Sequence, residues 1–164
     1  MTEPRFSVIA ALDSNNLIGR DNRMPWNIPE DLKYFRAKTL GHTVLMGKNT
    51  WLSLGRTLDE RVNIILSRDK KLTVPGAIVC HGVPDCLRHC PDDECFVIGG
   101  AQIFRLFLPL ASKLHLTRID AEFEGDTHFP VIDPEAWELI SFEAVTSVTG
   151  FDLAFTEYRR CRKP

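Results

Sequence analysis

Apolar and polar blocks alternate along the first two thirds of the chain. Residues 6–12 (FSVIAAL) form an almost uninterrupted apolar run, which is typical of a strand covered on both faces. A helix is expected over residues 28–40, ended by Gly41. Further strands are expected at 43–47, 62–67, 77–80 and 94–98, and further helices at 48–54, 84–90 and 101–108. The alternation predicts an α/β fold with a mainly parallel sheet and right-handed crossovers.

The last third of the chain has a different pattern. Residues 113–120 and 151–160 alternate apolar and polar side chains, and residues 137–142 form a shorter run. Because no helix separates these segments, we expect them to pair antiparallel at one side of the sheet. No repeat, low-complexity tract or linker divides residues 1–164, so the sequence predicts one domain.

Composition and charge narrow the class of protein. The chain has 164 residues, of which 44% are hydrophobic and 26% charged, as in ordinary globular proteins. A net charge of -2 does not favour nucleic acid or an anionic membrane as a partner. No apolar run is long enough to span a bilayer, and residues 1–5 lack the features of a signal peptide. We therefore expect a soluble cytoplasmic protein.

Five cysteines raise the question of a metal site or disulfides. Cys86 and Cys90 are four residues apart with His89 between them, but there is no C-x-x-C pair and no cleanly spaced second pair of ligands. An odd number of cysteines without a secretory signal favours reduced thiols. We expect no metal, and we expect Cys80 and Cys95 to pack as small hydrophobic side chains.

The start of the first helix is the most informative stretch of the sequence. Asn27 is expected to cap this helix, and Pro29 suits its first turn, where no N–H partner is needed. The three- and four-residue spacing of Leu32, Tyr34 and Phe35 predicts that these side chains mark the buried side.

Asp31 is the first candidate for chemistry. It lies three and four residues before two aromatic residues, so its carboxylate is carried on or beside the apolar face. A loop of small and polar residues, Trp26 and an acid against aromatics describe the edge of a small-molecule pocket. The alternative is an acid in the first helical turn that complements the dipole and faces water.

Three strand ends carry features that suit phosphate. Gly99-Gly100 follows one strand and opens a helix, Gly47-Lys48-Asn49-Thr50 follows another, and Ser67-Arg68 ends a third. Glycines let a ligand approach the backbone, and a helix N-terminus offers unpaired N–H groups. The alternatives are a plain tight turn and solvated surface cations.

Three such sites at the ends of strands in one sheet suggest a dinucleotide across the carboxyl edge. Lys48 and Arg68 add the positive charge that a 2′-phosphate needs, which favours NADPH over NADH.

Taken together, several short motifs resemble bacterial dihydrofolate reductases over nearly the whole chain. The motifs are Ile9-Ala10-Ala11, Leu17-Ile18-Gly19, Met24-Pro25-Trp26, Asp31-Leu32 with Phe35, Met46-Gly47 with Thr50-Trp51, Asn63-Ile64-Ile65-Leu66-Ser67, Ile98-Gly99-Gly100-Ala101 and Gly125-Asp126-Thr127-His128-Phe129-Pro130. The resemblance implies an eight-stranded, mostly parallel sheet with an antiparallel C-terminal strand, flanked by four helices. It also implies NADPH-dependent reduction of 7,8-dihydrofolate to tetrahydrofolate in a target of antifolate inhibitors, which we expect to act as a monomer.

The resemblance also implies roles for residues on the folate side. Asp31 would accept hydrogen bonds from the pterin, supported by Thr117, and Trp26 would hold a water nearby. Arg61 would pair with the α-carboxylate of the substrate. The other expected substrate contacts are Ile9, Ala10, Leu32, Phe35, Leu54 and Ile98.

On the cofactor side, the resemblance implies that Ala11, Ile18 and Ile98 enclose the nicotinamide, with Met24 on a lid. The pyrophosphate and adenosine sides are expected to involve Gly47, Lys48, Asn49, Thr50, Leu66, Ser67, Arg68, Gly99, Gly100, Ala101, Gln102, Ile103 and Phe104. The hydride would pass from C4 of the cofactor to C6 of the substrate. Water admitted by the lid would protonate N5, and burial of Asp31 beside Phe35 is expected to raise its pKa.

Three positions depart from the commonest pattern of the family. Phe104 stands where many relatives have tyrosine, Asp59-Glu60 replaces the usual Pro-Gly turn, and residues 145–150 differ from the usual polar loop. Two other functions stay open. One is a pyrimidine reductase of riboflavin synthesis on a related fold, against which the pairing of Trp26 with Asp31 argues. The other is a non-catalytic nucleotide-binding module.

Overall fold

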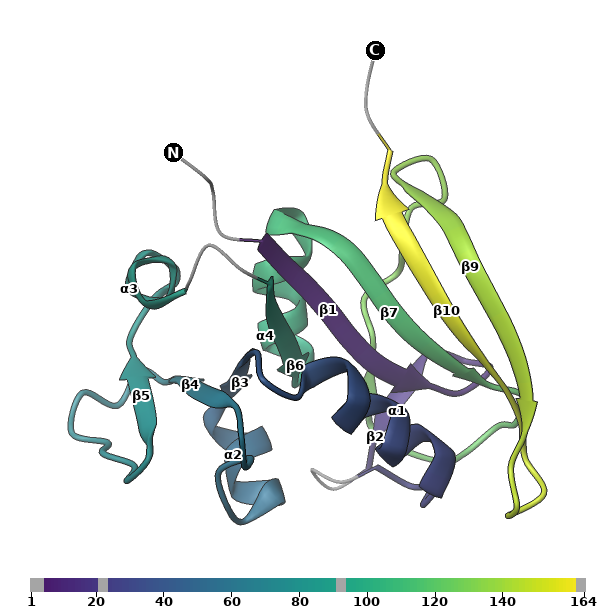
Figure 1. Cartoon of the computed structure of the whole chain (residues 1–164), viewed down its shortest axis with the longest axis horizontal. Coiled ribbons are helices and arrows are strands. Elements are labelled where there is room, and N and C mark those ends of the chain that lie inside the picture. The colour runs from purple at the N-terminus through teal and green to yellow at the C-terminus, as the bar shows by residue number, and fades with distance from the viewer. Residues whose placement is uncertain (1–4, 21–23, 91–93, 162–164) are drawn as a thin grey trace.

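A single eight-stranded sheet forms the centre of the molecule (Figure 1). The computed structural model describes residues 5–20, 24–90 and 94–161. The strands of the eight-stranded sheet are β1 (Arg5–Leu12), β3 (Thr43–Gly47), β4 (Val62–Leu66), β5 (Ala77–Cys80), β6 (Glu94–Gly99), β7 (Ala111–Ile119), β9 (Trp137–Thr146) and β10 (Asp152–Arg160). The helices are α1 (Pro29–Thr39), α2 (Lys48–Leu54), α3 (Val83–His89) and α4 (Ala101–Phe107), followed by the 3₁₀ turn η1 (Leu108–Leu110).

The strand order β5-β4-β3-β6-β1-β7-β10-β9 confirms the predicted fold class. Neighbouring strands from β5 to β7 pair parallel, whereas β10 pairs antiparallel with both β7 and β9. The carboxyl ends of β3, β4 and β6 therefore meet at one edge, with Gly47 beside Leu66 and Met46 beside Gly99. This is the edge where the sequence predicts a dinucleotide.

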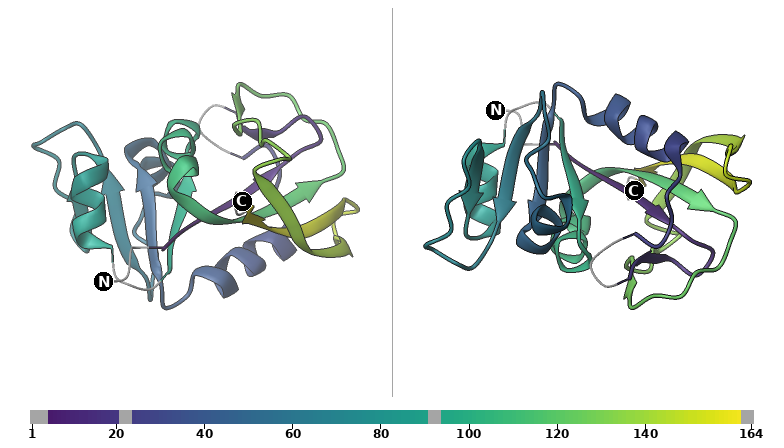
Figure 2. Two further views of the ribbon diagram at one scale, coloured as in Figure 1. Left: turned by 90° about the horizontal axis from the view of Figure 1, so that it is seen from above. Right: turned by 90° about the horizontal axis from the view of Figure 1, so that it is seen from below.

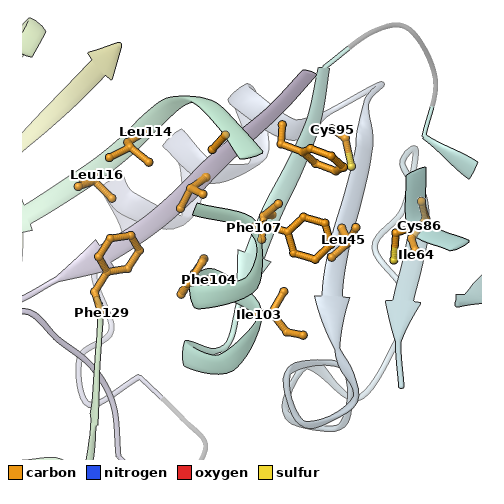
Figure 3. Close-up of a cluster of buried hydrophobic side chains, with 14 of the residues drawn as sticks. Leu45, Ile64, Cys86, Cys95, Ile103, Phe104, Phe107, Leu114, Leu116 and Phe129 are labelled. Carbon is orange, nitrogen blue, oxygen red and sulfur yellow. The ribbon is translucent and has the colours of Figure 1, made fainter. Parts of the chain in front are cut away.

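The two faces of the sheet carry separate apolar layers, and α1 lies on the face opposite α4 (Figure 2). Alternate residues of each strand point to opposite faces, so Val8 and Leu45 join the α4 layer whereas Ile9 and Val44 join the α1 layer. The α4 layer contains Ile103, Phe104 and Phe107 of the helix together with the labelled residues of β3, β4 and β7 (Figure 3). Cys80 and Cys95 are fully buried in this layer, as predicted.

A second, two-stranded sheet was not predicted. It pairs β2 (Leu17–Gly19) with β8 (Thr127–His128), which are too short for a hydrophobic period to reveal. Gly125 lies against β2 so closely that an added Cβ would stand 2.5 Å from the carbonyl oxygen of Gly19. Gly125, which precedes β8, is thereby packed directly on β2.

β9 is longer than predicted, reaching Thr146 rather than residue 142. Most of its residues are exposed because it is the edge strand of the sheet, so its sequence lacks the burial pattern on which the prediction relied.

Two predictions about the start of α1 were wrong. Its N-cap is Ile28, with no side-chain capping hydrogen bond, so Asn27 does not cap it. Leu32 is 49% exposed, whereas Asp31 is buried. The polar residue therefore faces inward and the apolar residue lies at the surface, the reverse of an ordinary amphipathic helix. None of the helices in the described ranges is long and apolar enough to cross a bilayer.

Candidate active site

Asp31 lies in the first turn of α1 and is only 9% exposed. It helps to line a pocket formed by Met24, Trp26, Asn27, Ile28, Asp31 and Leu32. The acid therefore does not simply face water, which excludes the alternative reading of an exposed acid at the helix end.

The environment of Asp31 disfavours its charged form. Burial raises the pKa of this carboxyl above its ordinary value, and a hydrogen bond with the Thr117 side chain partly offsets the rise. Thr117 is itself buried in β7, where it pairs with Ala11 of β1 and Phe155 of β10. A residue of the central sheet thus supplies a hydrogen bond that stabilises the charged form of Asp31.

Trp26 carries a buried polar atom beside the same pocket. The residue is 6% exposed, and its ring packs on Phe123 with a centroid distance of 5.2 Å. Its Nε1 has no hydrogen-bond partner among the described residues. A buried donor of this kind usually meets water or a ligand, so this atom marks a polar point in an otherwise apolar wall.

Two large apolar side chains, Met24 and Leu32, line the pocket together with Asp31. Met24 is 48%, Leu32 is 49% and Leu54 is 40% exposed, whereas Phe35 is half-buried. Exposed apolar residues gathered beside a polar group are typical of a surface that a ligand covers.

Arg61 is held at the end of α1. Its Nε donates to the Asp59 carbonyl oxygen at 2.8 Å, and its Nη1 donates to Thr39 Oγ1 at 3.1 Å. Glu60 has a positive φ of 58° in this turn and pairs with Arg36 across 3.4 Å. The Asp59-Glu60 segment thus forms a defined turn that orients one edge of the Arg61 guanidinium and leaves other donors for a ligand.

Gly47, Gly99 and Gly100 lie together at the sheet edge and form what we call the glycine cradle. The bond between Gly99 and Gly100 is cis, and Gly99 has a φ of 121°, which L side chains rarely adopt. An added Cβ at Gly99 would lie 3.2 Å from the Phe104 ring, and one at Gly47 would lie 2.9 Å from Ile103 Cγ1. Thr50 Oγ1 lies 3.7 Å from the Cβ positions of both Gly99 and Gly100. Close packing thus excludes a side chain at Gly47 and Gly99, and the Thr50 hydroxyl lies beside the Gly99-Gly100 backbone.

Two exposed cations flank this cradle. Lys48 begins α2 after β3, and Arg68 follows β4, the strand next to β3. Ser67 is buried, and its hydroxyl accepts a hydrogen bond from Asp69 N at 3.1 Å. The donor set of backbone, hydroxyl groups and cations fits a phosphorylated dinucleotide with an extra phosphate on its ribose.

Comparisons with known proteins decide which family this geometry belongs to. The family model described as dihydrofolate reductase matches residues 5–160. A dihydrofolate reductase of Bacillus subtilis is 42% identical over 158 residues, covering 94% of this chain and 94% of that protein. One from Staphylococcus haemolyticus is 37% identical, covering 96% and 97%. The chain belongs to the dihydrofolate reductase family.

A solved structure supports the same assignment. Dihydrofolate reductase from Enterococcus faecalis, complexed with NADP(H) and RAB-propyl, superposes with a TM-score of 0.91 at 30% identity, covering 98% of this chain and 99% of that one. These matches confirm the resemblance to dihydrofolate reductases that the motifs indicated. The protein is an NADPH-dependent oxidoreductase of the dihydrofolate reductase type.

The structure distributes the predicted nicotinamide residues of this reductase over three strands. Ala11 is on β1, Ile18 on β2 and Ile98 on β6, where β1 and β6 pair directly. Phe104 is buried against Phe129 at a centroid distance of 5.0 Å and packs beneath Gly99. Asn49 and Gln102 are exposed on the first turns of α2 and α4. Residues 21–23 of the loop before Met24 lie outside the described residues, so the predicted lid contacts stay predictions.

A possible metal-ligand cluster lies away from this site. One ligand atom each of Cys80, Asp85 and His89 lie within 4.8 Å of one another. Both oxygens of Asp85 already accept hydrogen bonds, one from Arg88 Nη2 at 3.0 Å and one from His81 N at 3.2 Å. The positive charge of Arg88 on Asp85 disfavours the binding of a metal cation at this cluster. That the protein holds no metal stays a prediction.

Sequence reasoning missed two polar anchors of the site. Asp13 is buried at the end of β1, where its carboxylate accepts hydrogen bonds from the N–H groups of Asn15, Leu17 and Phe123. An Asx turn directly after a buried strand is the signal that could have identified it. The other anchor is Glu30, whose partners lie more than a hundred residues away and leave no local signal.

Proposed function

We propose that this reductase converts 7,8-dihydrofolate to tetrahydrofolate around Asp31, which binds the pterin and promotes protonation at N5. The observation that carries the proposal is a 9%-exposed carboxyl whose pKa is raised by burial, beneath a rim of exposed apolar side chains. A buried acid with a raised pKa is suited to acid–base work near neutral pH.

Asp31 would accept hydrogen bonds from the pterin N3–H and the 2-amino group. Thr117 fixes the direction of the carboxyl, because its hydroxyl is anchored on β7. The unpartnered Nε1 of Trp26 supports a role in holding a water molecule near the pterin.

The rest of the substrate would lie along the exposed side chains. Leu32 and Leu54 offer apolar surface to its ring system, with Phe35 half-buried beside them and Ile9 and Ala10 on β1. Arg61 would pair with the α-carboxylate, and its contacts with Asp59 and Thr39 supply the preorganisation for that pairing.

The cofactor residues would act by binding and orientation. When bound, NADPH supplies the hydride that reduces C6. Gly99, Gly100 and Thr50 would receive the pyrophosphate, while Lys48 and Arg68 would bracket the 2′-phosphate. Ala11, Ile18 and Ile98 would hold the nicotinamide against the pterin and exclude bulk water, which is the alignment that hydride transfer requires.

Proton delivery would depend on the negative charge of Asp31. Its negative charge at the pterin edge would favour the protonated form of the substrate. Water reaching N5 past Met24, which is 48% exposed at the pocket, would donate the proton. This division of labour keeps the hydride step in a site with little water and still allows one proton to enter.

The proposal is tested by following NADPH absorbance with dihydrofolate, without substrate and with NADH in place of NADPH. We expect rapid loss of absorbance only with NADPH and dihydrofolate together. Cofactor binding without turnover would indicate a non-catalytic module. Turnover with a ribosylated aminopyrimidine but not with dihydrofolate would indicate the pyrimidine reductase.

We also propose that the enzyme acts as a monomer in the cytoplasm. One chain supplies Asp31, Thr117, Arg61 and the glycine cradle, which supports a site complete within one copy. Five cysteines without a disulfide between them suit a reducing compartment. Light scattering on the purified enzyme is expected to give the mass of one chain, and fractionation of cells is expected to recover activity in the soluble fraction.

A further inference from the structure

A carboxylate next to Asp31 ties α1 to the loop between β9 and β10. Glu30 Oε1 accepts a hydrogen bond from Ser147 Oγ at 2.7 Å, and Glu30 Oε2 accepts one from Val148 N at 2.8 Å. These contacts join residues that are 117 and 118 positions apart. They hold the pKa of Glu30 below its ordinary value, chiefly through Ser147, so the carboxylate is charged at neutral pH.

The loop is built to present these two donors. Ser147 is 5% exposed, its N–H donates to the Phe151 carbonyl at 2.8 Å, and its own carbonyl accepts from Gly150 N at 2.9 Å. Its hydroxyl also accepts from Thr149 N at 3.1 Å and lies 2.7 Å from Thr149 Oγ1. Because a serine has one hydroxyl proton, which goes to Glu30, Thr149 is the donor in the pair of hydroxyl groups.

The same hairpin supports the pocket at two more points. Tyr34, one turn after Glu30, stacks on Phe155 of β10 with a centroid distance of 4.2 Å and an interplanar angle of 14°. Phe151 packs on Phe123 at 5.4 Å, and Phe123 packs on Trp26 at 5.2 Å. The hairpin therefore packs against the helix that carries Asp31 and, through Phe123, against Trp26.

The first turn of α1 has no side-chain cap, although Ile28 is buried in the core and Asp31 bonds with Thr117. Its N-cap, Ile28, provides no side-chain hydrogen bond, and Asp31 N bonds only locally, to the Ile28 carbonyl at 3.1 Å. Glu30 adds a long-range contact to this uncapped turn, which is the turn that carries Asp31.

We propose that Glu30 is a positioning residue of this reductase, which fixes the Asp31 carboxyl in its buried setting by binding the first turn of α1 to Ser147 and Val148. The proposal deepens the role of Asp31 and rests on it. Released from the loop, the turn moves outward, Asp31 gains water, and the benefit of its burial for protonation is reduced.

The ionisable groups around this region come from three elements. Tyr34 belongs to α1, Glu143 to β9 and Glu157 to β10. Burial raises the pKa of Tyr34 to about 12, with the charges of Glu157, Asp31 and Glu143 adding to the rise, so Tyr34 stays neutral. Tyr34 therefore does not change its charge in the pH range of the experiment.

Two variants separate the contact from the charge of Glu30. Glu30→Gln removes the charge and gives Val148 N a poorer partner, whereas Ser147→Ala removes the donor and leaves the charge. Glu138→Gln is the matched control, because Glu138 lies on the same hairpin and, within the described residues, forms an ion pair with Arg159 at 3.3 Å. The double variant Glu30→Gln/Ser147→Ala measures whether the two residues act as one unit.

The readout is single-turnover hydride transfer from pH 5 to 9, with NADPH titrations and thermal melts on each protein. For Glu30→Gln and Ser147→Ala we expect a rate at pH 7 lowered roughly 3- to 10-fold, the effect of one or two modest hydrogen bonds. We expect the pH transition of the rate to move toward acid in both variants. NADPH affinity should stay unchanged, and the Glu138→Gln control should behave as wild type. The rate of the double variant should be no lower than that of Glu30→Gln alone.

Other results overturn the proposal. A lower melting temperature with an unchanged rate and pH profile means that the contact only stabilises the fold. A shift in Glu30→Gln that Ser147→Ala does not share means that the charge acts without the contact. If Asp31→Asn keeps full turnover, the role of Asp31 itself has failed, whatever the Glu30 variants do.

Discussion

Burial of the Asp31 charge costs the fold stability at neutral pH. A carboxyl with a raised pKa contributes its full stability below its ordinary pKa of 3.8 and loses it as the pH rises through the raised value. Among the described residues, the hydrogen bond with Thr117 is the contact that lowers the pKa of Asp31 and so stabilises its charge at pH 7. Such a cost is common where a site is kept ready for a ligand.

Replacing this charge with a neutral amide should therefore stabilise the protein. We expect Asp31→Asn to raise Tm at pH 7 by roughly 2–4 °C, the shift that about 1 kcal/mol produces in a chain of this size. The difference should shrink as the pH falls toward 3.8. Calorimetric melts over this range provide the test, with exposed Asp120→Asn as the control. A variant that melts lower at pH 7 would contradict the account of a costly buried charge.

Lys48 and Arg68 carry the prediction about cofactor choice. Changing both to alanine should weaken NADPH far more than NADH, because only NADPH has the 2′-phosphate. Charge-assisted contacts of this kind are worth roughly 1.5–3 kcal/mol each when well formed, and exposure of both side chains puts these at or below the lower end. Fluorescence titrations of both cofactors measure the difference, and Lys70→Ala is the nearby control. Equal losses for the two cofactors would remove these residues from the phosphate site.

At the scale of elements, β2 and β8 link the loop that carries Met24 to a second segment. Leu17 pairs with His128 and Gly19 with Thr127, while Asp126 N donates to the Gly19 carbonyl at 3.1 Å. This pairing places residues 125–128 beside the strand from which the loop departs. Changes in this segment should therefore affect the loop that carries Met24.

The side chain of Asp126 is the place to test that coupling. It accepts a hydrogen bond from Thr127 Oγ1 at 2.8 Å. We expect Asp126→Ala to slow hydride transfer roughly tenfold and to leave the fold intact, because the closed loop becomes less populated. Single-turnover rates with protiated and deuterated cofactor measure the change in hydride transfer. Glu124→Ala, at an exposed neighbouring position, is the control. An unchanged rate would show that the loop is held in another way, for example through the hairpin bound by Glu30.

The sequence predicted those elements whose burial is regular. β1 and β3 were recognised as apolar runs because parallel strands are covered on both faces. β2, β8 and the end of β9 were not, since two are very short and the third is exposed at the edge.

Within the site, the sequence indicated Asp31 but assigned the wrong surroundings to its helix. Leu32 was expected in the core and lies at the rim, because the pocket reverses the usual pattern of an amphipathic helix. The contact of Glu30 with Ser147 could not be predicted, since no local pattern joins residues 117 positions apart.

At the scale of the whole molecule, a buried polar cluster joins four strands of the sheet. His115 of β7 is 3% exposed, with Nε2 4.0 Å from Glu94 Oε2 on β6 and Nδ1 3.3 Å from Glu157 Oε1 on β10. The Ser7 hydroxyl on β1 donates to the same oxygen of Glu94. The interaction with His115, followed by that with Ser7, lowers the pKa of Glu94 to about 2 despite its partial burial.

This cluster should make the stability of the enzyme sensitive to acid. A depressed pKa gives stability that is present above the ordinary value of 4.5 and is lost as the pH falls through about 2. We expect Glu94→Gln to lower the unfolding free energy at pH 7 by about 1–2 kcal/mol and to flatten its dependence on pH below 4.5. Urea unfolding at several pH values measures both, with Glu138→Gln as the control. An unchanged acid dependence would show that another group governs acid unfolding.

The central claim is that a buried Asp31 promotes protonation of the substrate, and the pH dependence of hydride transfer tests it most directly. The measurement compares wild type with Asp31→Asn in single turnovers from pH 5 to 9, with a NADPH titration as the control. Asparagine keeps the shape but loses the charge and replaces one acceptor with a donor.

We predict that Asp31→Asn lowers the rate at pH 7 by roughly two to four orders of magnitude, the range for a positioned acid–base group. The wild-type rate should fall as the pH rises through its transition, the variant should recover in acid, where solvent protonates the substrate, and NADPH affinity should barely change. A variant with near-wild-type rate at pH 7 would contradict the claim and reduce Asp31 to a structural acid at the start of α1.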